Sequence, residues 1–199
     1  MLGGILRGKR TLLRVPTEAD IDGIARWAAD MRVRGALTRA YWDEPATRAT
    51  WKERLTKQSE DKGSVLWAIE ADGALAGSCR VEFNVEPGAD HIDVTHFTID
   101  PERWSQGLGS DAALTLSRWI FDIVHARSSS TSLAAHNTAA IKLADRLGYK
   151  TFAVGHAVHY GDGRYVDELQ LRMDLETWDE RWGEAEREYP VLLGEELER

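Results

Sequence analysis

The chain has 199 residues, 43% of them hydrophobic, and a formal net charge of −8. This length supports one domain with a full core and is too short for two domains of usual size. The negative charge argues against nucleic-acid binding. No apolar run approaches the length of a membrane span, and the single cysteine, Cys79, excludes an internal disulfide. We therefore expect a cytoplasmic protein that does not bind membranes.

The predicted elements alternate between strands and helices in chain order. A short strand over residues 11–15 precedes two helices that start after Thr17 and Thr47. Strands follow over 65–70, 75–85 and 91–99, and then a helix from 111 to about 124. A short strand from Leu133, a helix over 138–147 and a hairpin with strands over 152–160 and 165–173 complete the order. This order predicts an α/β layer fold with one sheet.

The strand over residues 91–99 carries the titratable side chains of most interest. Neighbouring side chains of a strand point to opposite faces. We therefore expect Asp93 to share a face with Phe97, and His96 to lie on the other face.

A glycine-rich turn joins this strand to the following helix. It reads Gln106-Gly107-Leu108-Gly109-Ser110. Glycine permits positive φ and close approach of a ligand to backbone N–H groups. The first turn of a helix adds unpaired N–H groups and the positive end of the helix dipole. The turn therefore predicts an anion site, normally one for phosphate.

The same glycines also fit the dinucleotide pattern G-x-G-x-x-G/A, with Ala112 as the last residue. Two features count against that alternative. Residues 100–106 separate the strand from the glycines, and residues 124–137 contain no carboxylate to bind a ribose.

A second motif makes the assignment specific. It runs from Asn137 and Ala140 to Leu143, Gly148 and Tyr149, and it starts 28 residues after Gly109. The pair of motifs resembles the acetyl-CoA signature of the GNAT N-acetyltransferases, and within them the RimJ/RimL-type branch. The resemblance implies a mixed central sheet of about seven strands with helices on both faces. It covers a domain over residues 8–174, followed by an acidic helical extension over 175–199.

The resemblance also implies the cofactor and its contacts. Acetyl-CoA would be a co-substrate, with its pyrophosphate on the backbone amides from Gln106 to Ser110. The pantetheine arm would pair with the strand end at Phe97, Thr98 and Ile99, and Asn137 would hydrogen-bond it while capping its own helix. Trp104 and Ser105 depart from the family pattern of the turn, and Ala144 replaces the tyrosine acid of many members.

Acetyl transfer requires a neutral amine, and a nearby base helps to deprotonate it. Asp93 is the first candidate for this base, because many members of the family place a carboxylate on this strand. His96 has a suitable unperturbed pKa, and Glu82 on the preceding strand could act through water. No Cys/His spacing suggests a metal site.

The remaining alternatives concern partners. A primary amine, either a protein N-terminus or a small molecule, would be the acceptor. A non-catalytic acyl-CoA sensor of the same fold is the other possibility. Ten carboxylates and three arginines occupy residues 174–199. The candidates for a homodimer contact in this tail are Trp178, Trp182, Tyr189, Val191 and Leu192.

Overall fold

A computed structural model describes residues 4–36, 47–83, 90–161 and 164–183. One mixed sheet of eight strands runs through it in the order β1-β2-β3-β4-β5-β6-β8-β7. All neighbouring strands are antiparallel except β5 and β6, which are parallel. The sheet has one strand more than the seven expected, because Leu6 and Arg7 pair with β2.

The strands match the predicted order. Their bounds are β1 (Leu6–Arg7), β2 (Leu12–Arg14), β3 (Ser64–Ala71), β4 (Ala74–Phe83), β5 (His91–Ile99), β6 (Ser128–Ala134), β7 (Lys150–Gly161) and β8 (Arg164–Asp174).

The helices have bounds α1 (Ile21–Ala29), α2 (Met31–Arg34), α3 (Arg48–Glu60), α4 (Leu108–Arg118), α5 (Thr138–Leu147) and α6 (Leu175–Trp182). A 3-10 turn (Glu18–Asp20) opens α1, and the predicted start at Thr17 is confirmed. Thr17 N donates to the Asp20 carboxylate at 2.7 Å. Thr47 caps α3 by accepting from Thr50 N at 3.2 Å. A π-helical turn (Trp119–Ile123) continues α4.

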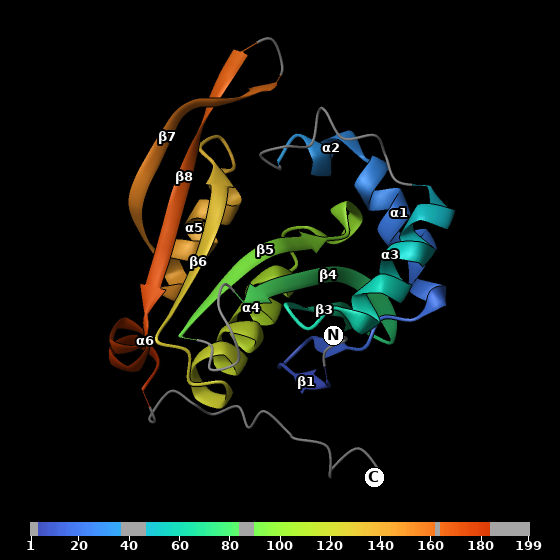
Figure 1. The fold of residues 1–199 in the computed structure, drawn as a ribbon, viewed down its shortest axis with the longest axis horizontal. Coiled ribbons are helices and arrows are strands. Elements are labelled where there is room, and N and C mark those ends of the chain that lie inside the picture. The colour runs from blue at the N-terminus through green and yellow to red at the C-terminus, as the bar shows by residue number, and fades with distance from the viewer. Residues whose placement is uncertain (1–3, 37–46, 84–89, 162–163, 184–199) are drawn as a thin grey trace.

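The helices cover both faces of the sheet (Figure 1). Cys79 and Val81 of β4 are fully buried in the main core, which includes the inner face of α4. The alternate residues Ser78 and Arg80 instead line a cavity with residues of α1 and α3. Successive side chains of a strand face opposite sides, so α4 and the α1–α3 pair lie on opposite faces. In Figure 1, α5 lies behind β6 and β8.

A β-bulge interrupts the pairing of β4 with β5. Arg80 pairs with His96 and Val81 pairs with Val94, so Thr95 has no partner in β4. An extra residue in one strand shifts the inside–outside alternation by one position. The strand is therefore not a regular alternation from end to end.

The bulge changes which side chains of β5 share a face. Asp93 pairs with Glu82 of β4, and His96 pairs with Arg80, which lies two positions before Glu82 on the same strand. Side chains directly opposite each other, and those two residues apart, share a face. Asp93 and His96 therefore lie on one face, while Phe97 pairs with Cys79 on the other. The expectation that Asp93 shares a face with Phe97 is wrong.

Helix α6 packs on the core of its own chain. Trp178 is fully buried, its ring stacks on Phe121 at 5.3 Å, and its Nε1 donates to Asp122 at 2.7 Å. Trp182 Nε1 donates to the Leu147 carbonyl at 2.9 Å. Trp178 is therefore not available for the homodimer contact considered above, and the homodimer itself stays a prediction. The domain boundary after Asp174 stays a prediction, and residues 184–199 lie outside the described chain.

Candidate active site

Strands β5 and β6 pair only at their beginnings. Residues 91–93 pair with residues 128–130, and beyond that point the two strands diverge. Thr131 Oγ1 donates to the Val94 carbonyl at 3.0 Å and closes the vertex of the opening. From Val94 onward, β5 keeps its backbone pairing on the β4 side alone within the described chain. Its other edge can therefore accept an extended ligand as if it were another strand.

A cavity of about 650 Å³ occupies this opening. Residues of β5, β6, α4 and α5 line it, including the expected Phe97 and Asn137 and the catalytic candidates Glu82, Asp93 and His96. Thr98 and Ile99 continue β5 toward the glycine turn. The volume falls within the range of cavities that hold cofactor-sized ligands.

The glycine turn begins α4 as predicted, although its two glycines differ. Gly107 is the N-cap and has φ of 82° in the left-handed region, as does Ser105 with φ of 62°. Gly109 lies inside the first turn without positive φ. A Cβ at Gly109 would lie 3.5 Å from Ile99 Cγ1, which is ordinary contact. Gly107 therefore meets a backbone requirement, and Gly109 leaves space beside the end of β5.

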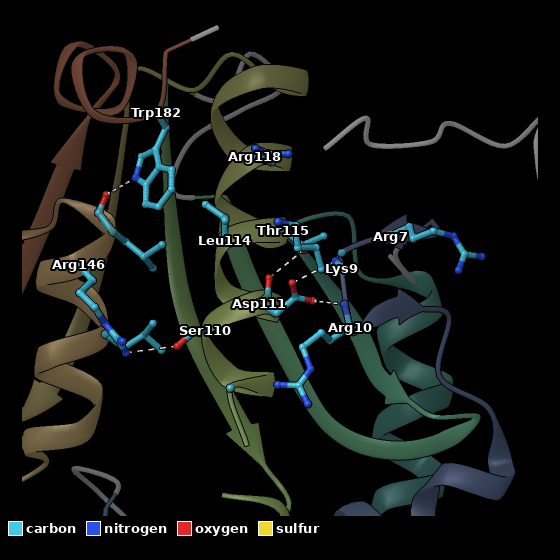
Figure 2. Close-up of a pocket in the computed structure, with 14 residues that line it drawn as sticks. Arg7, Lys9, Arg10, Ser110, Asp111, Leu114, Thr115, Arg118, Arg146 and Trp182 are labelled. Atoms are coloured by element: carbon cyan, nitrogen blue, oxygen red, sulfur yellow. Dashed lines mark hydrogen bonds between the residues drawn. The ribbon is translucent and has the colours of Figure 1, made fainter. Parts of the chain in front are cut away.

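Two arginines flank the start of α4 (Figure 2). Arg10, from the turn between β1 and β2, donates from Nη1 to the Gln106 carbonyl. Arg146, from α5, donates from Nη2 to Ser110 Oγ at 3.2 Å. Both acceptors are neutral, so both cationic charges add to the positive end of the helix dipole. No pattern in the sequence indicates this pair, because the tertiary fold brings together residues far apart in the chain.

A groove of about 370 Å³ extends from these arginines along α4. Its basic side chains are Arg7, Lys9, Arg10, Arg118 and Arg146. Asp111 is its carboxylate, and it accepts hydrogen bonds from the backbone of Lys9, Arg10 and Thr11 at 3.0, 3.0 and 2.9 Å. Since Asp111 holds the β1–β2 turn in place, the groove presents an excess of positive charge beside the helix start. Phosphate groups are suited to this surface.

Asn137 has the capping role expected for it. Its Oδ1 accepts from Ala140 N at 3.2 Å at the start of α5. Its Nδ2 donates to the Ala36 carbonyl at 3.1 Å, and both residues line the large cavity. The side chain thus joins α5 to the segment after α2 at the wall of the cavity.

Asp93 belongs to a hydrogen-bonded cluster at the vertex of β5 and β6. His91 Nε2 lies 3.1 Å from Asp93 Oδ1, and Ser130 Oγ donates to the same oxygen. His91 Nδ1 lies 2.7 Å from Ser128 Oγ. From the sequence alone, His91 would have a surface or capping role. The parallel pairing of β5 with β6 brings its hydrogen-bond partners beside it, and the sequence does not reveal that pairing. Glu82 lies in an ion pair with Arg80 at 3.2 Å.

His96 occupies a different position from Asp93 and Glu82. Its Nε2 lies 2.9 Å from Ser78 Oγ. Burial, together with the nearby Arg80 guanidinium, lowers the pKa of His96 to about 4. The imidazole is therefore neutral at pH 7 and can accept a proton.

His96 also lines a second cavity, of about 400 Å³, on the face covered by α1 and α3. Among the described residues, His96 is the one that lines both cavities. The two cavities are therefore neighbours with His96 in the wall between them. The second helix predicted to start after Thr47 is confirmed as α3, and its residues Trp51 and Leu55 line this cavity.

Ala144 and Tyr149 meet in the large cavity. The Tyr149 hydroxyl donates to Ser129 Oγ at 2.9 Å, and burial raises the pKa of Tyr149 to about 12. Tyr149 thus places a protonated phenol in the same cavity in which α5 carries Ala144 instead of the family's tyrosine. Cys79 is fully buried in the core, and burial raises the pKa of its thiol.

The described residues contain neither a metal cluster nor a membrane-spanning helix. No group of three or more metal-binding side chains occurs among them. No helix of that part of the chain is long and apolar enough to cross a membrane.

A sheet that opens at one parallel pair, with a glycine turn and a basic helix start beside the opening, provides a site for an extended ligand that carries phosphate groups. Residues 10–150 match the family model described as "Acetyltransferase (GNAT) domain". The match spans more than half of the chain, and the chain therefore belongs to the GNAT acetyltransferase family. It is an acetyl-CoA-dependent N-acetyltransferase, and acetyl-CoA is its co-substrate.

Solved structures share this fold. A spermidine N-acetyltransferase from Vibrio cholerae, in complex with CoA and spermine, has a TM-score of 0.75 at 17% identity, covering 85% of this chain and 98% of that one. RimL, a ribosomal L7/L12 alpha-N-protein acetyltransferase in complex with CoA, has a TM-score of 0.73 at 13% identity, covering 87% and 99%. A putative acetyltransferase from T. thermophilus has a TM-score of 0.72 at 21% identity, covering 94% and 98%. At these identities the likenesses show the fold alone.

Proposed function

We propose that the enzyme acetylates a primary amine by direct attack of the amine on acetyl-CoA in a ternary complex. The observation that carries this proposal is the place of His96 in the wall of both cavities. Acetyl-CoA would enter the larger cavity, between β5 and β6, and the amine the smaller one. Holding the two reactants on either side of one residue provides the proximity on which such a transfer depends.

The geometry of the opening supports the cofactor contacts that the resemblance implies. The pyrophosphate would bind the backbone amides from Gln106 to Ser110, between Arg10 and Arg146. The pantetheine arm would lie along the free edge of β5 at Phe97, Thr98 and Ile99, beside Asn137. Backbone N–H groups at the same edge would stabilise the oxyanion as the thioester carbonyl gains charge.

We propose that His96 accepts the proton that the attacking amine loses. Of the three candidates, His96 reaches both cavities, whereas Asp93 and Glu82 line only the larger one within the described chain. Its ring is neutral at pH 7, and because its pKa is only about 4 it is a weak base that passes the proton on rather than keeping it. Asp93 and Glu82, on the same face of the sheet, would receive the proton next or hold water that carries it.

The departing thiolate of CoA needs a hydrogen-bond donor, and Ala144 provides none. We assign this role to the Tyr149 hydroxyl, which stays protonated at a pKa of about 12 and would turn its single hydrogen from Ser129 Oγ to the thiolate. Tyr149→Phe should lower kcat while leaving the Kd for acetyl-CoA nearly unchanged. An unchanged kcat would remove Tyr149 from the mechanism.

One comparison of variants tests the base. His96→Gln should lower turnover by about 10²–10⁴ at neutral pH and leave acetyl-CoA affinity intact by calorimetry. Asp93→Asn and Glu82→Gln should lower turnover by smaller factors. If Asp93→Asn is instead the most damaging variant, Asp93 is the base and His96 is a wall residue.

The RimJ/RimL-type resemblance supports a protein N-terminus or a small molecule as the acceptor. A screen of amines for CoA release tests the activity. If acetyl-CoA binds and no amine releases CoA, the chain acts as an acyl-CoA sensor instead.

A further inference from the structure

The smaller cavity has a mainly apolar wall. It lies between α1, α3 and the strands β3, β4 and β5, and its volume is about 400 Å³. Its apolar side chains are Ile21, Ile24, Trp51, Leu55 and Leu66. A cavity of this size and lining holds a small organic body by burial of apolar surface.

The carboxylate that lines this cavity is Asp61. Ser64 Oγ, Gly63 N and Arg80 Nη2 donate to it at 2.5, 2.8 and 3.5 Å. The Ser64 hydroxyl and the Gly63 N–H lower the pKa of Asp61, so the carboxylate is charged and already satisfied by protein donors. It is therefore poorly placed to receive the ammonium group of a ligand.

Three cations line the same cavity: Arg54, Lys57 and Arg80. Lys57 pairs with Glu53 at 2.6 Å, and Arg80 pairs with both Asp61 and Glu82. Arg54 lies over the Trp51 ring at 5.1 Å and has no carboxylate within ion-pair distance in the described chain. Arg54 is therefore the cation of this lining that no carboxylate of the described chain neutralises, and it already occupies the aromatic face that could attract a ligand cation.

We propose that the acceptor is a primary amine on an apolar body that carries no second positive charge, bound with its nitrogen at His96. This inference rests on the proposed function and deepens it. A polyamine would place a second ammonium group beside Arg54, where like charges repel. The nearby Arg54 charge also favours the neutral form of the reacting amine, which is the form that attacks. The apolar amine can belong to a small molecule or to the first residue of a peptide.

A substrate series tests the apolar wall. CoA release is measured with linear amines from propylamine to hexylamine, with phenethylamine and with spermidine. Each added methylene should raise kcat/KM by roughly fourfold until the cavity is filled, as expected for a buried CH₂ group. Spermidine should be at least tenfold poorer than hexylamine. A short peptide with an N-terminal leucine, run beside phenethylamine, separates the two sources of the amine.

A pair of charge variants tests the electrostatic part. Arg54→Glu should raise kcat/KM for spermidine by tenfold or more, because it replaces the excess cation with a carboxylate. Lys52→Glu is the charge control, since it makes the same charge change on the same helix outside the lining of the cavity. It also breaks the ion pair of Lys52 with Glu18, and Lys52→Gln measures that loss separately. Both positions are exposed, so both variants should fold. An equal gain in the two variants would show only a general effect of net charge and would overturn the proposal.

The outcomes separate this inference from the proposed function. If acetyl-CoA binds and spermidine is the best substrate of the unmodified enzyme, the inference is wrong and the acetyltransfer mechanism stands. If kcat/KM is flat along the linear series, the apolar cavity does not hold the acceptor. If acetyl-CoA binds by calorimetry and none of these amines releases CoA, both proposals fail.

Discussion

Asp93 and His96 project from the same face of β5, although three positions separate them in the strand. The bulge at Thr95 produces this relationship, since it adds one residue to β5 opposite β4. A regular strand would place the two side chains on opposite faces. The bulge therefore brings the two candidate bases to one side of the sheet, with Arg80 and Glu82 opposite them on β4.

Burial of neutral His96 should make the folded protein acid-sensitive. Its pKa of about 4 in the folded state lies below the ordinary 6.5. The unfolded chain binds more protons between these two values, so stability falls as pH decreases from 6.5 to 4. Between pH 7 and pH 5, the unfolding free energy of the unmodified protein should fall about 2 kcal/mol more than that of His96→Gln. Urea titrations at both pH values measure this difference, and parallel losses in the two proteins would show that His96 titrates normally.

The two glycines of the turn should respond differently to alanine. Gly107→Ala should lower the unfolding free energy by about 1–2 kcal/mol, because φ of 82° is unfavourable for a residue with a Cβ. Gly109→Ala should leave stability within about 1 kcal/mol and weaken acetyl-CoA binding, because its Cβ would stand beside the end of β5. Urea unfolding and calorimetry with acetyl-CoA separate the two effects. Normal binding by Gly109→Ala would mean that the ligand does not approach this position.

The arginines beside α4 should recognise the phosphates of CoA. Arg10→Gln and Arg146→Gln should each weaken acetyl-CoA binding by about tenfold or more, since each removes a charged hydrogen-bond donor. Neither should change the KM for acetyl-pantetheine, which lacks the nucleotide. Lys150→Gln is the control, because Lys150 is exposed, pairs with Asp145 at 3.4 Å and does not line the groove. Equal losses with both acyl donors would assign the arginines to the fold rather than to the phosphates.

Trp178 should be essential for stability although it follows the predicted domain. Trp178→Ala should cost about 3–5 kcal/mol, the usual loss for a large aromatic side chain in a core. Trp178→Phe should cost much less, because it keeps the stack on Phe121 and loses only the hydrogen bond to Asp122. Urea denaturation of the three proteins tests this order. A small loss in Trp178→Ala would mean that α6 is an appendage to the core.

The sequence by itself determined the family and the cofactor. Local signals carried this information: Gly107 and Gly109 after a strand, Asn137 before a helix and Gly148 after it. These residues act through backbone conformation and caps, which depend on neighbours a few positions away. The order of elements and the acetyl-CoA requirement followed from the same short motifs.

Only the tertiary structure decided how the site is assembled. The bulge at Thr95 depends on the register of β5 against β4, which an alternating sequence does not encode by itself. The pairing of Arg10 and Arg146 around one helix start joins residues 136 positions apart in the chain. The same holds for Trp178, whose burial depends on Phe121 from another element. Such contacts arise from packing of distant elements, and local propensity therefore leaves them undetermined.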